Sequence, residues 1–156
     1  MGLFLAVCCY QLYNTVFLFG EAATTPSKIF QDQVAQFCAN APANTNALVF
    51  CTSQGAIIAK NALKDMPEEY RNRLDMRSIA PAAYIPREFC RSIRNYAAAR
   101  DLIPMIDMKG RRKYADTLQI VPSHPTAPFF DHSFSSRTFE SYIKYEIEQY
   151  KSAIGN

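Results

Sequence analysis

Short apolar runs recur along the chain, and most are followed by a stretch in which apolar residues have helical spacing. A continuously apolar run of a few residues is typical of a strand that is buried on both faces of a parallel sheet. This pattern predicts about five strands. They are Leu3 to Leu12, Asn46 to Cys51, Met76 to Ala80, Ile93 to Ala99 and Thr117 to Val121.

Three longer stretches have the periodicity of amphipathic helices. The first begins at Thr24 or Thr25 as N-cap, with Pro26 at the first helical position, and the last is capped by Ser135 or Ser136. A short helix or turn is expected at 87–93. The predicted buried faces are Ile29, Phe30, Val34, Phe37 and Cys38 in the first helix, Ile57, Ile58, Ala62 and Leu63 in the second, and Phe139, Tyr142, Ile143, Ile147 and Tyr150 in the last.

Alternation of strands and helices predicts an α/β fold, a three-layer sandwich around a mostly parallel sheet. With 156 residues, 49% of them hydrophobic and 20% charged, the chain fits a single globular domain over residues 1–156. No repeat or linker divides it.

Residues 1–20 are apolar enough to suggest a membrane span, but Gln11 and Asn14 lie inside them and no basic residue flanks their start. We therefore expect a buried strand there, and membrane association through this apolar segment is the alternative. A chain that opens directly on such a strand also looks short at its beginning.

Charge and cysteine usage exclude several classes of function. A net charge of +3 is too small to indicate nucleic-acid binding, and the one basic cluster, Lys109 to Tyr114, is predicted to be a solvated loop. The five cysteines form no CxxC pair and have no histidine companions at ligand spacing. They favour free, buried thiols in a reducing compartment such as the cytoplasm, without a metal site or cofactor.

Candidate chemistry follows the strands, because ligands of parallel α/β sheets bind at the carboxyl ends of the strands. Ser53 follows the second strand, Asp101 the fourth, and His124 and His132 the fifth. A nucleophilic serine on a sharp strand-to-helix turn needs small residues two positions to either side, so that strand and helix can approach. Gly55 meets this requirement and Cys51, which is small, permits it.

The segments LYNTVFLFG, ALVFCTSQGAIIAKNAL, IAPAAYIP, NYAAARDLIPMID and DHSFSSRTFESYI resemble the α/β-hydrolase superfamily, among its lipase-like members with a His-Ser-Gln-Gly nucleophile motif. More narrowly, they resemble an uncharacterised group of chlamydial proteins with that motif. Cys51 and Thr52 depart from it. The resemblance implies a minimal or truncated hydrolase that cleaves a carboxylic ester, from a small molecule or a lipid, with nucleophile Ser53, acid Asp101 and base His132.

Such a mechanism needs backbone N–H groups that bind the oxyanion. One donor is expected from Gln54, at the start of the helix that follows the serine. The other is expected from the loop after the first strand, near Asn14 or Thr15.

Each candidate also has a structural interpretation. The Ser53 hydroxyl could cap the following helix, Asp101 could cap a turn or pair with Arg100, and the base could be His124 instead of His132. These alternatives make different geometric predictions. A working triad requires His132 within hydrogen-bond reach of both Ser53 and Asp101, roughly 2.6 to 3.2 Å.

Other residues have weaker functional interpretations. Cys51 is a thiol nucleophile by one interpretation and a buried, inert thiol by the other, and Asp131 is expected to act as a cap. Tyr142, Tyr145 and Tyr150 are expected to pack or lie at the surface. Aromatic rings that stack nucleic-acid bases need a basic groove around them, and the sequence shows none. A hydrolase fold without activity, used for binding or as a structural module, is the second hypothesis for the whole chain.

Overall fold

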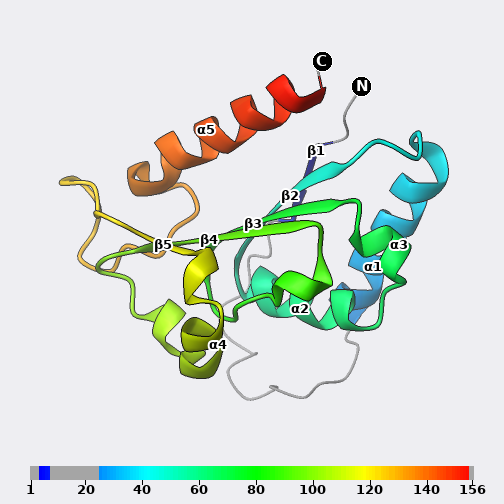
Figure 1. Cartoon of the computed structure of the whole chain (residues 1–156). Coiled ribbons are helices and arrows are strands. Elements are labelled where there is room, and N and C mark those ends of the chain that lie inside the picture. The colour runs from blue at the N-terminus through cyan, green and yellow to red at the C-terminus, as the bar shows by residue number, and fades with distance from the viewer. Residues whose placement is uncertain (1–3, 8–24, 155–156) are drawn as a thin grey trace.

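The computed structural model describes residues 4–7 and 25–154, and its centre is a parallel β-sheet (Figure 1). The strands pair side by side in the order β1-β2-β3-β4-β5, all parallel. Their bounds are Phe4–Val7 (β1), Ala47–Ser53 (β2), Leu74–Pro81 (β3), Ser92–Ala98 (β4) and Leu118–Val121 (β5). The predicted α/β class with a parallel sheet is confirmed. The rest of the first predicted strand, Leu3 and residues 8–12, lies outside the described residues.

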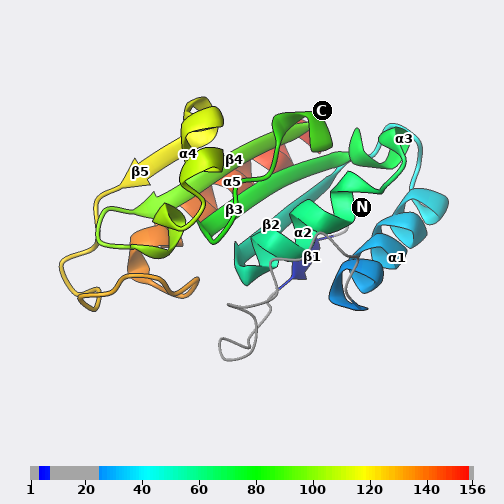
Figure 2. The ribbon, with the colours of Figure 1, turned by 90° about the horizontal axis from the view of Figure 1, so that it is seen from below.

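Helices cover both faces of the sheet, which gives the expected three layers (Figures 1 and 2). The strand order advances in one direction, so successive right-handed crossovers pass over the same face. That face carries α1 (Thr25–Asn40), α2 (Gln54–Lys64), α3 (Glu68–Arg71) and α4 (Met108–Lys113), while α5 (Arg137–Ile154) covers the other. The described residues also form three short 3-10 helices, η1 (Arg87–Phe89), η2 (Ile103–Met105) and η3 (Ala115–Thr117).

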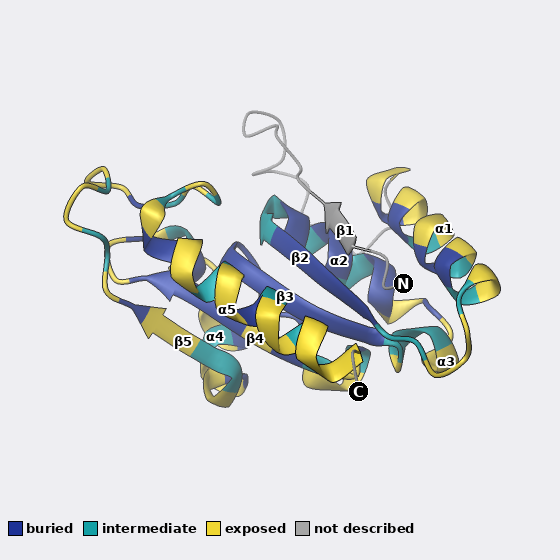
Figure 3. Ribbon diagram, turned by 90° about the horizontal axis from the view of Figure 1, so that it is seen from above, coloured by how far each residue is buried: buried dark blue, intermediate teal, exposed yellow. Residues whose placement is uncertain are grey.

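Two buried clusters of side chains, one on each face of the sheet, form the core. Leu48 and Phe50 of β2 pack toward α5, whereas Val49 and Cys51 pack toward α1 and α2. Adjacent residues of a strand point to opposite faces, so a strand covered on both sides must be apolar at every position. This explains the continuous apolar run that predicted β2, and Figure 3 shows the central strands buried along most of their length.

The residues of the predicted helix faces mostly pack toward the core, but not all are buried. On α5, Phe139 is buried, whereas Tyr142, Ile143, Ile147 and Tyr150 are only partly buried. Two corrections fall on α1. Ile29 was expected to be buried but is 53% exposed, and Cys38 is only partly buried. The small Ser27 occupies the contact with α2 instead, and its hydroxyl donates a hydrogen bond to the Ile58 carbonyl at 3.3 Å. On α2, Ile57 is likewise only partly buried.

The segment Lys109 to Tyr114 is predicted to be a solvated loop; most of it forms α4 instead, while Lys109, Arg112 and Lys113 are exposed as expected. Asp107 caps the helix by accepting the Gly110 N–H at 2.8 Å. The Asp107 carboxylate occupies the space that a Cβ atom at position 110 would fill, so the cap requires glycine there. Tyr114, which follows the helix, is buried. Within the described ranges, no helix combines the length and the apolar character needed to cross a bilayer.

A buried carboxylate attaches α5 to the sheet. Glu146 is 1% exposed and accepts hydrogen bonds from Arg77 Nε at 2.5 Å, from Arg94 at 2.7 Å and from the Tyr96 hydroxyl. Burial raises the pKa of Glu146, but the hydrogen bonds from Tyr96, Arg77 and Arg94 outweigh it, so the pKa lies below its ordinary value. The carboxylate is therefore charged and fully engaged in the folded protein.

We expect Glu146→Ala to lower the free energy of unfolding by about 3 kcal/mol, because it leaves the guanidinium of the buried Arg77 without its partner. Urea denaturation followed by circular dichroism measures the change. Glu148→Ala is the matched control on the same helix, since that side chain is exposed and its carboxylate forms a surface ion pair with Lys151. Its effect should stay below about 1 kcal/mol. Equal effects of the two substitutions would contradict a structural role for the buried cluster.

Candidate active site

Ser53 lies at the junction of β2 and α2 in a backbone conformation that residues with a side chain rarely adopt. Its φ is 49° and its ψ is −120°. The only other non-glycine residue with positive φ among those described is Ala80, near the end of the neighbouring strand β3. Such strain persists only where the surroundings enforce it, and it is common at active sites.

The Ser53 hydroxyl does not cap α2, although the residue occupies the N-cap position. The capping interpretation of this serine is therefore wrong. The hydroxyl instead lies 2.8 Å from Nε2 of His132. The turn projects the side chain away from the helix amides and toward the ends of the later strands.

Asp101 and His132 complete a chain of hydrogen bonds with Ser53. His132 Nδ1 lies 2.7 Å from Oδ2 of Asp101, and the second oxygen of Asp101 accepts the Ile103 N–H at 3.0 Å. The Asp101 side chain is 0% exposed and that of His132 12% exposed. If Nδ1 carries the proton and donates it to Asp101, Nε2 is free to accept the Ser53 proton. Both distances lie within the hydrogen-bond reach set out above.

The alternative candidates do not join this arrangement. His124 is turned back on its own loop, with Nδ1 2.8 Å from the Thr126 hydroxyl and accepting the Thr126 N–H at 3.1 Å. Arg100 does not bond Asp101, since its guanidinium donates to the carbonyls of His124 and Ala127.

Cys51 lies inside β2 and is 1% exposed. Burial raises the pKa of its thiol to about 11. A thiol with so high a pKa is almost entirely protonated near neutral pH and is therefore a poor nucleophile. The structure favours the interpretation of Cys51 as a buried, inert thiol.

A second buried carboxylate fixes the loop that carries His132. Asp131 accepts hydrogen bonds at 2.6 Å from the hydroxyls of Ser136 and Thr138, at the start of α5. Burial raises the pKa of Asp131, but these hydrogen bonds lower it below its ordinary value. The carboxylate thus ties the residue before His132 to α5.

Tyr84 supports the loop that carries Asp101, a role that the sequence did not predict. Its buried hydroxyl donates to the Pro104 carbonyl at 3.2 Å, and its N–H donates to Asp107 at 3.0 Å. The signal in the sequence is a tyrosine within the apolar, proline-bounded stretch after β3. Without its distant partners, that stretch could not be distinguished from ordinary core.

Of the two predicted sources of oxyanion donors, only Gln54 lies among the described residues. Gln54 is the first residue of α2, directly after Ser53, so its backbone lies at the helix N-terminus as expected. Asn14 and Thr15 lie outside the described residues. In the described part of the chain, no group of three His, Cys, Asp or Glu side chains is placed to hold a metal ion.

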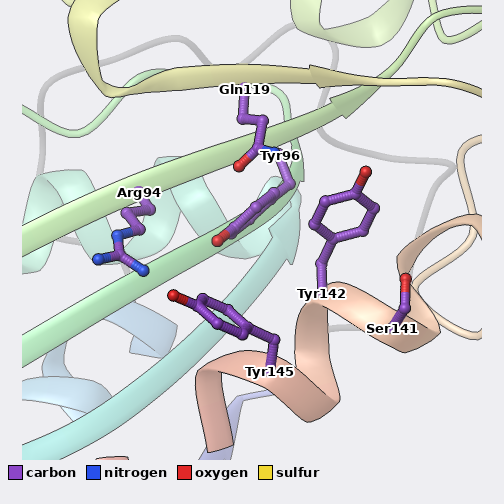
Figure 4. A pocket seen from close by; sticks show the side chains of 6 residues that line it. All are labelled: Arg94, Tyr96, Gln119, Ser141, Tyr142 and Tyr145. Carbon is purple, nitrogen blue, oxygen red and sulfur yellow. The ribbon is translucent and has the colours of Figure 1, made fainter. Parts of the chain in front are cut away.

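A separate cavity of about 580 Å³ lies between α5 and the strands β4 and β5 (Figure 4). Tyr142 and Tyr145 form its helix side, and neither Ser53 nor His132 lines it. Tyr142 packs against the core and Tyr145 is exposed, as the sequence predicted. Tyr150 also packs there, and its hydroxyl donates to the Asn46 carbonyl at 2.6 Å.

Comparisons of the chain with protein-family models, with curated proteins and with solved structures found no match.

The strain at Ser53 can be tested by substitution. We expect Ser53→Gly to have a free energy of unfolding about 1 kcal/mol higher than that of Ser53→Ala, because glycine adopts positive φ without a clash at Cβ. Thermal or urea denaturation of the two variants measures the difference. At the neighbouring Thr52, which lies within the strand, Thr52→Gly should be less stable than Thr52→Ala. Equal stability of the two Ser53 variants would show that the turn is not strained.

Proposed function

We propose that this chain is a serine hydrolase that cleaves a carboxylic ester through Ser53, His132 and Asp101. The observation that carries the proposal is the unbroken line of hydrogen bonds from the Ser53 hydroxyl through the imidazole to the buried carboxylate, at 2.8 and 2.7 Å. Hydrogen bonding of an imidazole between a hydroxyl on a strained turn and a buried acid is the arrangement that activates a serine.

In the first half of the reaction, His132 Nε2 takes the proton of the Ser53 hydroxyl while Oγ attacks the ester carbonyl. The Asp101 carboxylate holds the imidazole in the required tautomer and stabilises the imidazolium. The Gln54 N–H binds the developing oxyanion, together with a second donor that we assign to Asn14 or Thr15. Collapse of the tetrahedral intermediate expels the alkoxide, which receives its proton from His132 and leaves as an alcohol.

In the second half, His132 takes a proton from water, whose oxygen attacks the acyl-Ser53 ester. The new tetrahedral intermediate expels Ser53 Oγ, which regains its proton from His132. The products are a carboxylic acid and the enzyme in its starting state.

We further propose that the chain is a minimal α/β-hydrolase of the lipase-like kind. The serine follows β2, the acid follows β4 and the histidine follows β5, which is the chain order of α/β-hydrolases. Cys51 and Thr52 remain departures from the usual elbow motif. Cys51 packs inside the core, and its side chain leaves the Ser53 turn intact.

The proposal is tested by labelling with a fluorophosphonate probe, which reacts with activated serines. We expect the wild-type chain to be labelled and Ser53→Ala to remain unlabelled. His132→Ala should react at least about a thousandfold more slowly, because the general base is lost. The matched control is His124→Ala, which removes a histidine outside the hydrogen-bonded line and should react as the wild type does.

Two results would overturn the proposal. If folded wild-type protein is not labelled, the chain is an inactive hydrolase fold that serves in binding or as a structural module. If labelling persists in Ser53→Ala, the reactive group lies elsewhere.

A further inference from the structure

Large apolar side chains that are exposed to solvent concentrate on two loops. Of the ten such residues in the described part of the chain, six lie in residues 102–108 and 129–130, and Phe129 is 88% exposed. The six are Leu102, Met105, Ile106, Met108, Phe129 and Phe130. Single exposed apolar residues are ordinary, but a contiguous group of them marks an interaction site.

The two loops belong to one surface of the molecule. They follow the parallel strands β4 and β5 and leave the sheet at the same end (Figure 1). The hydrogen bond between Asp101 and His132 joins them directly, with Leu102 next to one partner. The Phe130 and His132 ring centroids lie 5.9 Å apart. Leu102 and Phe130 therefore lie beside the hydrogen bonds that join Ser53, His132 and Asp101.

Internal hydrogen bonds fix both loops while their apolar side chains stay outside. Tyr84 donates to the Pro104 carbonyl, and the Arg100 guanidinium donates to the carbonyls of His124 and Ala127. The backbone is thus held in place with Phe129 and Leu102 turned to solvent. A fixed presentation of this kind lowers the entropy lost when a partner binds.

The charges of the same region favour an anionic partner. Its carboxylates are used internally: Asp101 bonds His132, Asp131 bonds the start of α5, and Asp107 caps α4. Lys109 and Arg112 of α4 are exposed beside the apolar loop that precedes them. The surface therefore combines protruding apolar groups with free positive charge, a combination typical of proteins that bind the interface of anionic lipid membranes.

We infer that this face, residues 102–112 with 129–130, docks onto the surface of an anionic lipid bilayer. Leu102 and Phe129 enter the boundary between headgroups and acyl chains, and the α4 cations face the lipid phosphates. Docking in this orientation turns the edge of the sheet that carries Ser53, Asp101 and His132 toward the bilayer. The inference goes beyond the proposed hydrolase activity and does not depend on it.

Co-sedimentation with vesicles tests the docking. The full chain is mixed with vesicles of phosphatidylcholine alone, or of phosphatidylcholine with phosphatidylglycerol, and the bound fraction gives a partition coefficient. We expect the double variant Leu102→Ser/Phe129→Ser to lower that coefficient about tenfold or more on both vesicles. The control Ile29→Ser/Ile154→Ser removes two apolar side chains on α1 and α5 that are 53% and 49% exposed, and should change the coefficient less than about twofold.

A charge variant measures the electrostatic part of docking, and a variant of Ser53 separates docking from the proposed hydrolase activity. Lys109→Glu/Arg112→Glu should weaken binding to the vesicles that contain phosphatidylglycerol and leave binding to pure phosphatidylcholine unchanged. Ser53→Ala should bind both vesicles as the wild type does, so docking is measured even if the hydrolase proposal fails.

Several outcomes would overturn the inference. The first is that the wild-type protein binds neither kind of vesicle. The second is that the control variant on α1 and α5 loses as much binding as the Leu102→Ser/Phe129→Ser variant. The third is that the Leu102→Ser/Phe129→Ser variant binds as tightly as the wild type, which would place the lipid contact elsewhere in the chain. Sedimentation velocity without lipid adds a fourth. A wild-type dimer that becomes a monomer in the same variant would identify the face as a contact between two copies of the chain.

Discussion

The imidazole of His132 is hydrogen bonded on one side to the Ser53 hydroxyl and on the other to the Asp101 carboxylate. These two bonds join the ends of three strands, β2, β4 and β5. The strands are parallel and each is hydrogen bonded to its neighbours, so their carboxyl ends meet at one edge of the sheet. That edge is where the fold can bring together side chains that are 79 and 31 residues apart in the sequence.

Buried polar groups around this edge keep each part in position. Asp131 binds hydroxyls at the start of α5 and so holds the histidine loop, while Tyr84 holds the loop of the acid. Glu146 attaches α5 to the sheet through Arg77, Arg94 and Tyr96. Networks of this kind are costly when incomplete and rigid when complete. Here they provide a fixed frame for a site made of loops.

The sequence predicted the strands and the main helices, because these follow from local information, and it offered Ser53, Asp101 and two histidines as candidates after successive strands. Continuous apolar runs identify strands covered on both faces, and the order of the polar residues that follow them can be read directly. Local periodicity could not reveal α4, a short helix with four basic residues and one glycine that is capped by the side chain of Asp107. Nor could it reveal Glu146, because its partners Arg77 and Arg94 are 69 and 52 residues away. The choice between His132 and His124 likewise required the folded loop.

The central claim is that Ser53 forms a covalent acyl intermediate with the help of His132. It is tested most directly by rapid quenching of the protein during turnover of a p-nitrophenyl ester, followed by peptide mass spectrometry. The account predicts that the acyl mass appears on the peptide that contains Ser53, and that it is absent when His132→Ala is treated identically. Turnover with the acyl group attached to another residue would contradict it. So would turnover in which no acyl-protein is found, either in the wild type or in a variant that slows deacylation.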